Sequence, residues 1–178
     1  MDLKLFNELM SEGSPEQHPS EWQMFLEICE MYLRKHGIKN PVVVELGLWA
    51  NKQKKFYEQL LGAEHISVDM KKRQHPDIRG NTHDRKTLEV LKERLNGKSI
   101  NILFIDACHD YESIKKDFEM YSPLCSDVIV IHDLKLRRSG VGKFWDELKT
   151  KHKDFLFLSI YQYRESKIQM GIGMITKR

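Results

Sequence analysis

Cysteine is scarce in this chain, and no two cysteines are spaced as a metal-binding or redox motif. The three cysteines, Cys29, Cys108 and Cys125, are odd in number and scattered over 178 residues. This pattern argues against a disulfide framework and predicts a reducing compartment, so we expect a cytoplasmic protein. The lack of any Cys-x-x-Cys pair also argues against a structural zinc site.

The chain also lacks a long apolar segment. No run approaches the roughly 20 apolar residues that a membrane-spanning helix needs. Residues 1–14, MDLKLFNELMSEGS, have no basic region followed by an apolar one, so we expect no secretory signal. With 40% apolar and 31% charged residues, the composition is that of an ordinary globular protein without membrane contact.

A strong excess of one charge is absent as well. The formal net charge is only +3, from 29 Lys and Arg residues against 26 Asp and Glu residues. Basic clusters occur at residues 52–55, 71–73 and 135–138, and we interpret them as solvated faces. A nucleic-acid-binding module is the rival interpretation, but no aromatic residue interleaves with these lysines. A nucleic-acid partner is therefore not expected.

What is present is an alternation of short apolar runs and helical patterns, and the length suits a single domain. Residues 1–19 carry a glycine and two prolines, and we expect them to form an irregular arm. A helix should begin at Ser20, which forms a capping-box pattern with Gln23. Residues 1–40 are thus expected to be an arm and a helix that pack on a sheet formed within residues 41–178.

Five parallel strands are predicted at residues 42–46, 65–68, 77–79, 102–105 and 128–131. Helical patterns occur at about residues 52–61, 84–97, 110–121 and from about 141. Short apolar runs of this kind are typical of buried parallel strands. Residues 155–161 and 170–176 are β-rich runs joined by a polar turn, and they should pair antiparallel. We therefore predict an α/β fold, with a Rossmann-like seven-stranded mostly parallel sheet, helices on both faces and a C-terminal antiparallel hairpin.

Residues 101–134, NILFIDACHDYESIKKDFEMYSPLCSDVIVIHDL, place ionisable side chains at the ends of two predicted strands. Asp106 and His109 follow the first strand, and His132 and Asp133 follow the second. Ligands bind at the carboxyl edge of an open parallel sheet, so we expect these side chains to face a crevice. The alternative is that Asp106 and Asp133 only cap the loops that follow them.

The first two predicted strands have the layout of a nucleotide-binding half-sheet. Gly47 follows the first strand in a tight turn, where a glycine lets the chain pass close to a ligand. Asp69 ends the second strand, 22 residues after Gly47, where it is placed to accept hydrogen bonds from two ribose hydroxyls. The order of these features predicts a site for a nucleoside-containing cofactor.

The segment FIDACHDYESIKKDFEMYSPL, followed by VIVIHD, is similar to the pattern FIDGDHSYE…D…Y.PLL…VVHD. This pattern is found in class I S-adenosylmethionine-dependent methyltransferases, in the small-molecule O-methyltransferase and cephalosporin hydroxylase-like group. The resemblance covers about residues 41–178, and the terminal hairpin fits it because this fold adds an antiparallel seventh strand. It implies S-adenosylmethionine as the cofactor and a hydroxyl of a small or sugar-like molecule as the methyl acceptor.

The resemblance implies a set of cofactor-binding residues at the ends of the first four strands: Glu45, Gly47, Asn51, Asp69, Met70, Asn81, Thr82 and Asp106. In this set Glu45 and Gly47 line the methionine part of the cofactor. Asp69 holds the ribose, and Met70 lies against the adenine. The polar pair that follows the third strand is expected near the adenine as well.

The resemblance also implies a metal site. Asp106 and Asp133 fall where related metal-dependent O-methyltransferases place metal ligands. Leu134 stands where those enzymes have a third ligand, asparagine, and His132 is the candidate substitute. Two oxygen ligands favour a hard ion such as Mg²⁺, which is therefore a candidate second cofactor.

His109 falls where the metal-dependent relatives have a catalytic lysine, and it is the candidate general base. A histidine, with an ordinary pKa of about 6.5, suits the removal of a proton from the acceptor hydroxyl. The alternatives stay open that His109 is a hydrogen-bonded loop residue and that His132 has a structural role.

The first loop, GLWANKQ, departs from the family pattern of two or three glycines. Asn51 can replace a glycine, because Asn tolerates unusual backbone angles. Trp49 stands where a small residue is expected. If Trp49 fills the cofactor site, the chain is instead a non-catalytic nucleotide- or S-adenosylmethionine-binding protein of the same fold, and this is the alternative function.

Overall fold

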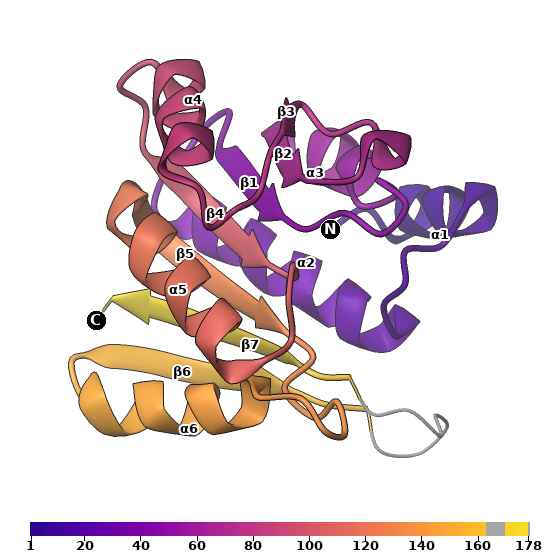
Figure 1. The fold of residues 1–178 in the computed structure, drawn as a ribbon. Coiled ribbons are helices and arrows are strands. Elements are labelled where there is room, and N and C mark those ends of the chain that lie inside the picture. The colour runs from indigo at the N-terminus through magenta and orange to yellow at the C-terminus, as the bar shows by residue number, and fades with distance from the viewer. Residues whose placement is uncertain (163–169, 178) are drawn as a thin grey trace.

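The computed structural model describes residues 1–162 and 170–177. These residues form a seven-stranded sheet in the order β3-β2-β1-β4-β5-β7-β6 (Figure 1). The strands are β1 (Val42–Leu46), β2 (Glu64–Asp69), β3 (Ile78–Arg79), β4 (Ile100–Ile105), β5 (Cys125–His132), β6 (Phe155–Ile160) and β7 (Ile172–Lys177). Strands β1 to β5 are parallel, and β7 pairs antiparallel with both β5 and β6. The predicted Rossmann-like fold is confirmed.

Helices cover both faces of the sheet (Figure 1). On one face lie α4 (Arg85–Leu95), α5 (Tyr111–Tyr121) and α6 (Val141–Lys151). On the other face lie α1 (Leu3–Glu12), α2 (Pro19–Lys35) and α3 (Lys54–Leu61). Strand β1 is buried along its whole length, because its alternate side chains enter the two cores. This two-sided burial explains why the central strands are apolar without alternation.

The register of the parallel strands brings their carboxyl ends to one level. Leu46 at the end of β1 pairs with Val68 of β2 and with Ile105 of β4. Ile105 in turn pairs with Ile131 of β5. The residues that follow these positions therefore emerge together at one edge of the sheet. These following residues are Gly47, Asp69, Asp106, His132 and Asp133.

The prediction of an irregular arm over residues 1–19 was wrong for its first part. Helix α1 (Leu3–Glu12) forms there, and the Asp2 side chain caps it by accepting a hydrogen bond from the Leu5 N–H at 3.0 Å. Phe6 and Leu9 are buried on the face that carries α2 and α3. The glycine and the two prolines, which suggested an irregular arm, all follow this helix.

The predicted capping box of Ser20 and Gln23 was also wrong. Helix α2 begins one residue earlier, with His18 at the N-cap and Pro19 in the first turn. Proline suits this position because its φ angle is already helical and it has no N–H to satisfy. The Ser20 hydroxyl instead lies 3.0 Å from Nδ1 of His18.

The predicted C-terminal hairpin is confirmed by the antiparallel pairing of β6 and β7. Most of its predicted polar turn lies outside the described residues. The separation of residues 1–40 from residues 41–178 stays a prediction. None of the helices in the described part of the chain has the length and apolar character needed to cross a bilayer.

Candidate active site

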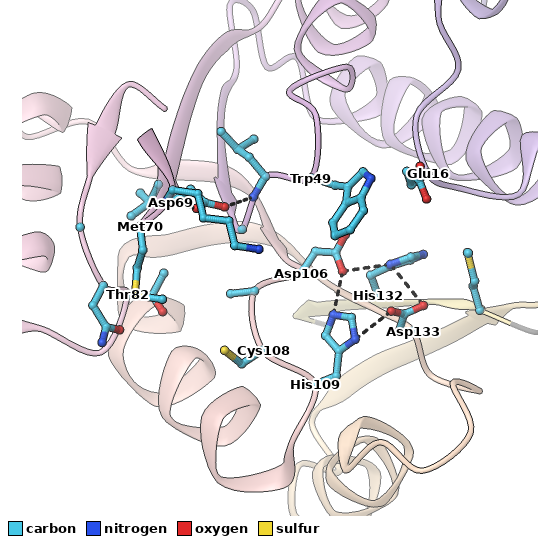
Figure 2. Close-up of a pocket in the computed structure, with 18 residues that line it drawn as sticks. Glu16, Trp49, Asp69, Met70, Thr82, Asp106, Cys108, His109, His132 and Asp133 are labelled. Atoms are coloured by element: carbon cyan, nitrogen blue, oxygen red, sulfur yellow. Dashed lines mark hydrogen bonds and ion pairs between the residues drawn. The ribbon is translucent and has the colours of Figure 1, made fainter. Parts of the chain in front are cut away.

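A cavity of about 350 Å³ opens at the carboxyl edge of the sheet. This volume is within the range of small-molecule sites. Its walls come from the loops after β1, β2, β3, β4 and β5, together with Glu16 and Met170 (Figure 2). Six of the eight residues predicted to bind the cofactor line this cavity: Gly47, Asp69, Met70, Asn81, Thr82 and Asp106. The candidate base and the remaining predicted metal ligands line it too: His109, His132 and Asp133.

Gly47 lets the loops after β1 and β4 pass in direct contact. Its φ angle is +88°, and a Cβ at this position would lie 2.3 Å from the carbonyl oxygen of Asp106. The Gly47 N–H donates to the carbonyl oxygen of Val68 at 2.9 Å, which ties the loop to β2. Only glycine combines this backbone conformation with this close approach.

Substitution of Gly47 by alanine should therefore lower the free energy of unfolding by more than backbone strain alone. Gly97 is the matched control, because its φ angle of +80° is similar but a Cβ there meets nothing within 4 Å. We expect about 1–2 kcal/mol for Gly97→Ala from the left-handed conformation. Gly47→Ala should cost about 1–3 kcal/mol more because of the clash. Urea unfolding measures both, and equal losses would show that the loops after β1 and β4 do not touch.

Asp69 is held by backbone N–H groups at the cavity wall. Its Oδ2 accepts a hydrogen bond from Leu48 at 2.7 Å, and its Oδ1 accepts one from Lys71 at 2.6 Å. Each oxygen of a carboxylate can accept a second hydrogen bond. The side chain is half-buried and is thus fixed in place while its remaining lone pairs stay open to a ligand.

Met70 and Thr82 lie at one end of the cavity, away from Asp133 (Figure 2). Met70 is 55% exposed, so it offers an apolar wall without filling the space. The carbonyl oxygen of Thr82 accepts a hydrogen bond from the Tyr121 hydroxyl at 2.8 Å, which fixes the loop after β3 against α5.

Glu45 and Asn51 do not line the cavity. Glu45 is fully buried, and its Oε2 lies 2.9 Å from Nε2 of His65. Burial raises the pKa of Glu45, and the hydrogen bond with His65 opposes this shift. Asn51 takes a φ angle of +50°, as expected of a residue that replaces a glycine, but its side chain does not line the cavity.

Trp49 stands at the cavity wall and does not fill it. Its side chain is 58% exposed, and it lines the cavity together with Asp106 (Figure 2). The ammonium of Lys71 lies 5.7 Å from the centre of its ring, within the range of a cation–π contact. The position of Trp49 therefore leaves space for a ligand.

Asp106, His109, His132 and Asp133 form one interacting cluster (Figure 2). Oδ1 of Asp106 lies 3.0 Å from Nδ1 of His132 and 3.5 Å from Nε2 of His109. The other ring nitrogen of His109, Nδ1, lies 3.1 Å from Oδ2 of Asp133. The two aspartates thus converge, because β4 and β5 are neighbours and end at the same level.

The cluster shifts the pKa of its members strongly. Burial raises the pKa of Asp106, but the charge of His132 and the hydrogen bonds with both histidines outweigh it and lower the value to about 2. Burial lowers the pKa of His132, but the Asp106 carboxylate outweighs it and raises the value to about 8. The hydrogen bond to Asp106 raises the pKa of His109. Burial raises the pKa of Asp133.

Three members of this cluster can share one metal ion. Asp106, His109 and Asp133 each offer a ligand atom, and these atoms all lie within 4.8 Å of one another. His132, the predicted substitute ligand, lies beside this group and directs its Nδ1 at Asp106. The donor set of two carboxylates and one imidazole suits a divalent ion with a preference for oxygen ligands.

Two residues that line the cavity were not predicted from the sequence. Glu16 lies between α1 and α2, in the segment interpreted as an irregular arm, and Met170 precedes β7. Glu21 does not line the cavity, but its carboxylate ties α2 to the segment that holds Met170, since it accepts hydrogen bonds from the backbone N–H groups of Gln162 at 2.6 Å and Gly171 at 3.1 Å. Contacts over such sequence distances follow only from the tertiary packing.

Residues 24–134 match the protein family described as a methyltransferase domain. This match covers more than half of the chain. The chain belongs to this methyltransferase domain family. The resemblance read from the motifs is thereby confirmed. The matched region contains all the candidate site residues from Glu45 to Asp133 and ends just after β5.

The fold of this methyltransferase domain is shared by solved structures of low sequence identity. The MycE methyltransferase of the mycinamycin biosynthetic pathway, in complex with Mg and SAH, superimposes with a TM-score of 0.64 at 14% identity. That alignment covers 97% of this chain and 54% of the MycE chain. Cofactor-bound Rv0187 from MTB gives a TM-score of 0.65 at 13% identity, over 99% of this chain and 89% of that one. The O-methyltransferase from Bacillus cereus in complex with SAH gives 0.60 at 14% identity, over 97% and 90%.

Among curated proteins, the chain is similar to an uncharacterized protein, y4gI, of Sinorhizobium fredii. The two are 34% identical over 95 residues, which make up 51% of this chain. The chain spans only 10% of the length of that relative.

Proposed function

We propose that this methyltransferase domain transfers a methyl group from S-adenosylmethionine to a hydroxyl of a small or sugar-like acceptor. The observation that carries the proposal is the cavity at the carboxyl edge of the sheet. Asp69 and Met70 form its nucleoside side, and Asp106, His109 and Asp133 converge at its other side. A cofactor that spans this cavity presents its reactive group to a cluster of acids and bases.

The residues of the nucleoside side fit S-adenosylmethionine. The fixed carboxylate of Asp69 can accept hydrogen bonds from ribose hydroxyls, and the exposed side chain of Met70 can pack on the adenine. When bound, the cofactor supplies a methyl group on a sulfonium, which is open to in-line displacement. MycE and the O-methyltransferase from Bacillus cereus were both solved with SAH, which supports this choice of cofactor.

The cluster of acids and bases fits the removal of a proton from the acceptor. In this structure both ring nitrogens of His109 face carboxylates. Catalytic hydrogen bonds often form only in the complex with substrate, so an acceptor hydroxyl can replace one aspartate as the partner of the imidazole. The walls of the cavity contribute to the rate by positioning, because they hold the acceptor and the methyl group in line.

Asp106 and Asp133 are the residues that would hold a divalent ion in this site. Their carboxylates converge in a buried place, and Oδ1 of Asp133 lies 3.5 Å from Nδ1 of His132 but has no hydrogen-bond partner within the described residues. A divalent ion held there would supply positive charge that lowers the pKa of an acceptor hydroxyl. MycE was solved with Mg and with mycinamycin VI, which supports both the ion and a small-molecule acceptor.

The non-catalytic alternative required Trp49 to occupy the cofactor site. Its indole is instead 58% exposed at the cavity wall, and this position favours the enzyme over the binding protein.

Replacement of Asp69 by alanine should weaken cofactor binding. The loss of hydrogen bonds to a charged group costs about 1.5–3 kcal/mol, which corresponds to roughly a 10- to 150-fold rise in Kd. Calorimetric titration with S-adenosylhomocysteine measures the change. Asp69→Asn serves as a size-matched variant, and Asp154→Ala, an exposed acid on the loop before β6, serves as the control. Equal affinity of Asp69→Ala and the unmodified protein would remove Asp69 from the cofactor site.

A further inference from the structure

The loop between β5 and α6 carries three cations close to the candidate active site. Lys135, Arg137 and Arg138 are all exposed, and we call residues 135–138 the cationic loop. None of the three forms an ion pair within residues 1–162 and 170–177. Some other surface cations are paired, as in Lys54 with Glu58 and Lys151 with Glu147. The cationic loop thus carries three positive charges with no ion-pair partner among the described residues, and the ammonium of Lys135 lies 5.0 Å from the centre of the Tyr161 ring.

The backbone fixes this loop to the acceptor side of the cavity. The Lys135 N–H donates to the carbonyl oxygen of Met170 at 2.7 Å, and Met170 lines the cavity. The Leu136 N–H donates to the carbonyl oxygen of Asp133 at 3.0 Å. At the far end of the loop, the Gly140 N–H donates to the carbonyl oxygen of His109 at 2.7 Å. The backbone that carries the cations is therefore held next to the residues of the acid–base cluster, and the exposed side chains of Lys135, Arg137 and Arg138 are not among those that line the cavity.

Two features of the cationic loop are unusual for a turn that only contacts solvent, and they favour a role in ligand binding. Arg138 has a φ angle of +67°, a left-handed conformation that is uncommon for a residue with a long side chain. Such conformations cluster at ligand clamps and active sites. The hydroxyl of Ser139 is buried and finds no hydrogen-bond partner in the described part of the chain.

Two further lysines extend the positive charge from the neighbouring helices. Lys115 of α5 and Lys143 of α6 stand over the ring of Tyr111, at 5.7 and 4.6 Å from its centre. Neither lysine forms an ion pair with any described carboxylate. Glu147, which accepts a hydrogen bond from the Tyr111 hydroxyl, is paired with Lys151. Cations that have no ion-pair partner among the described residues thus come from the cationic loop, α5 and α6.

We propose that the methyl acceptor carries a phosphate or a carboxylate group, which the cationic loop binds. This inference rests on the proposed function and names the acceptor class. Guanidinium groups bind both anions through paired N–H donors, and a local excess of positive charge attracts an anionic substrate to the cavity. Three cations within four residues match one compact anionic group. A nucleic-acid strand is recognised by a longer track of cations and by stacking on aromatic side chains.

Titrations of ¹⁵N-labelled protein test this inference with three matched probes: glucose, glucuronate and glucose 6-phosphate. In the presence of S-adenosylhomocysteine, the two anions should shift the backbone amide signals of residues 135–139 in a saturable manner, and glucose should not. Whether glucuronate or glucose 6-phosphate binds more tightly distinguishes a carboxylate from a phosphate. The R137Q/R138Q variant should weaken binding of the preferred anion by about tenfold or more. The matched control removes two cations from the opposite edge of the sheet, K92Q/R94Q at the end of α4, and should leave binding unchanged.

Three results would overturn the inference. In the first, glucose shifts the loop signals as strongly as the anions do. In the second, the R137Q/R138Q variant binds the anions as well as the unmodified protein does. In the third, neither anion shifts the loop signals at about 50 mM, a concentration that detects even weak binding. An RNA oligonucleotide that shifts the loop signals when the sugars do not would assign the loop to nucleic acid. Calorimetry with S-adenosylhomocysteine on the same samples tests the proposed function independently. If the protein does not bind S-adenosylhomocysteine, the proposed function is wrong. If it binds S-adenosylhomocysteine but neither anion, only this inference is wrong.

Discussion

Replacement of His109 by glutamine should lower the methyl-transfer rate by about 10²–10⁴-fold, the range for loss of a positioned general base. Glutamine keeps a similar size but cannot accept and hold a proton. The affinity for the cofactor should stay near that of the unmodified protein, because Asp69 and Met70 form a separate part of the cavity. Steady-state rates and calorimetry measure the two effects.

The same substitution should also remove the decrease in methyl-transfer rate that the unmodified protein is expected to show at low pH. The hydrogen bond to Asp106 raises the pKa of His109, so the neutral base is present only above a pKa that exceeds the ordinary value. The rate should therefore fall as the pH decreases through that raised pKa. His36→Gln is the control, since His36 is exposed and stacks on Tyr32 at the end of α2. A glutamine variant with full activity and an unchanged pH profile would make His109 a structural loop residue.

A chelator in excess should abolish methyl transfer, and a divalent ion such as Mg²⁺ should restore it. The expected loss is large, because an ion contributes several kcal/mol to the stabilisation of developing charge. Asp133→Asn should weaken ion binding and lower the rate without loss of the fold, since the amide keeps the size of the carboxylate. Binding of Mn²⁺, followed by electron paramagnetic resonance, measures the ion directly. Asp154→Asn is the control, because this acid is exposed and lies outside the cavity.

Two outcomes of these ion measurements separate the roles of the cluster. If catalysis persists in excess chelator with both aspartates intact, Asp106 and Asp133 only line the cavity. If His109→Gln weakens Mn²⁺ binding as strongly as Asp133→Asn, then His109 is a ligand of the ion, as its distance to both carboxylates allows. Unchanged Mn²⁺ binding in His109→Gln together with a slow rate supports the general base.

The sheet was predictable because local sequence patterns determine it. The run VVVEL predicted the observed bounds of β1, since it is buried on both faces and ends at Leu46, directly before Gly47. The parallel arrangement then fixed which residues meet, because strands that end at one level bring Asp69, Asp106 and Asp133 to the same edge. The cavity residues predicted from the strand ends follow from this single geometric rule.

The features that were missed depend on contacts between distant segments. Helix α1 is stable because Phe6 and Leu9 pack on α2 and α3, and its short sequence gave no sign of that partner. The inward turn of Glu45 toward His65 follows from the pairing of β1 with β2 and from burial on that face. The placement of His109 between two carboxylates depends on the loop geometry after β4, which the hydrogen bond from Gly140 helps to set.

The central claim is that this cavity carries out methyl transfer. The most direct measurement incubates the purified protein with S-adenosylmethionine labelled with tritium in the methyl group and with a small-molecule extract, and follows the label after separation. We predict that the label moves to a small molecule in the unmodified protein, and that His109→Gln slows this transfer by about 10²–10⁴-fold. Saturable binding of the cofactor without movement of the label to any small molecule, including the anionic fraction, would contradict the enzyme and favour the non-catalytic binding protein.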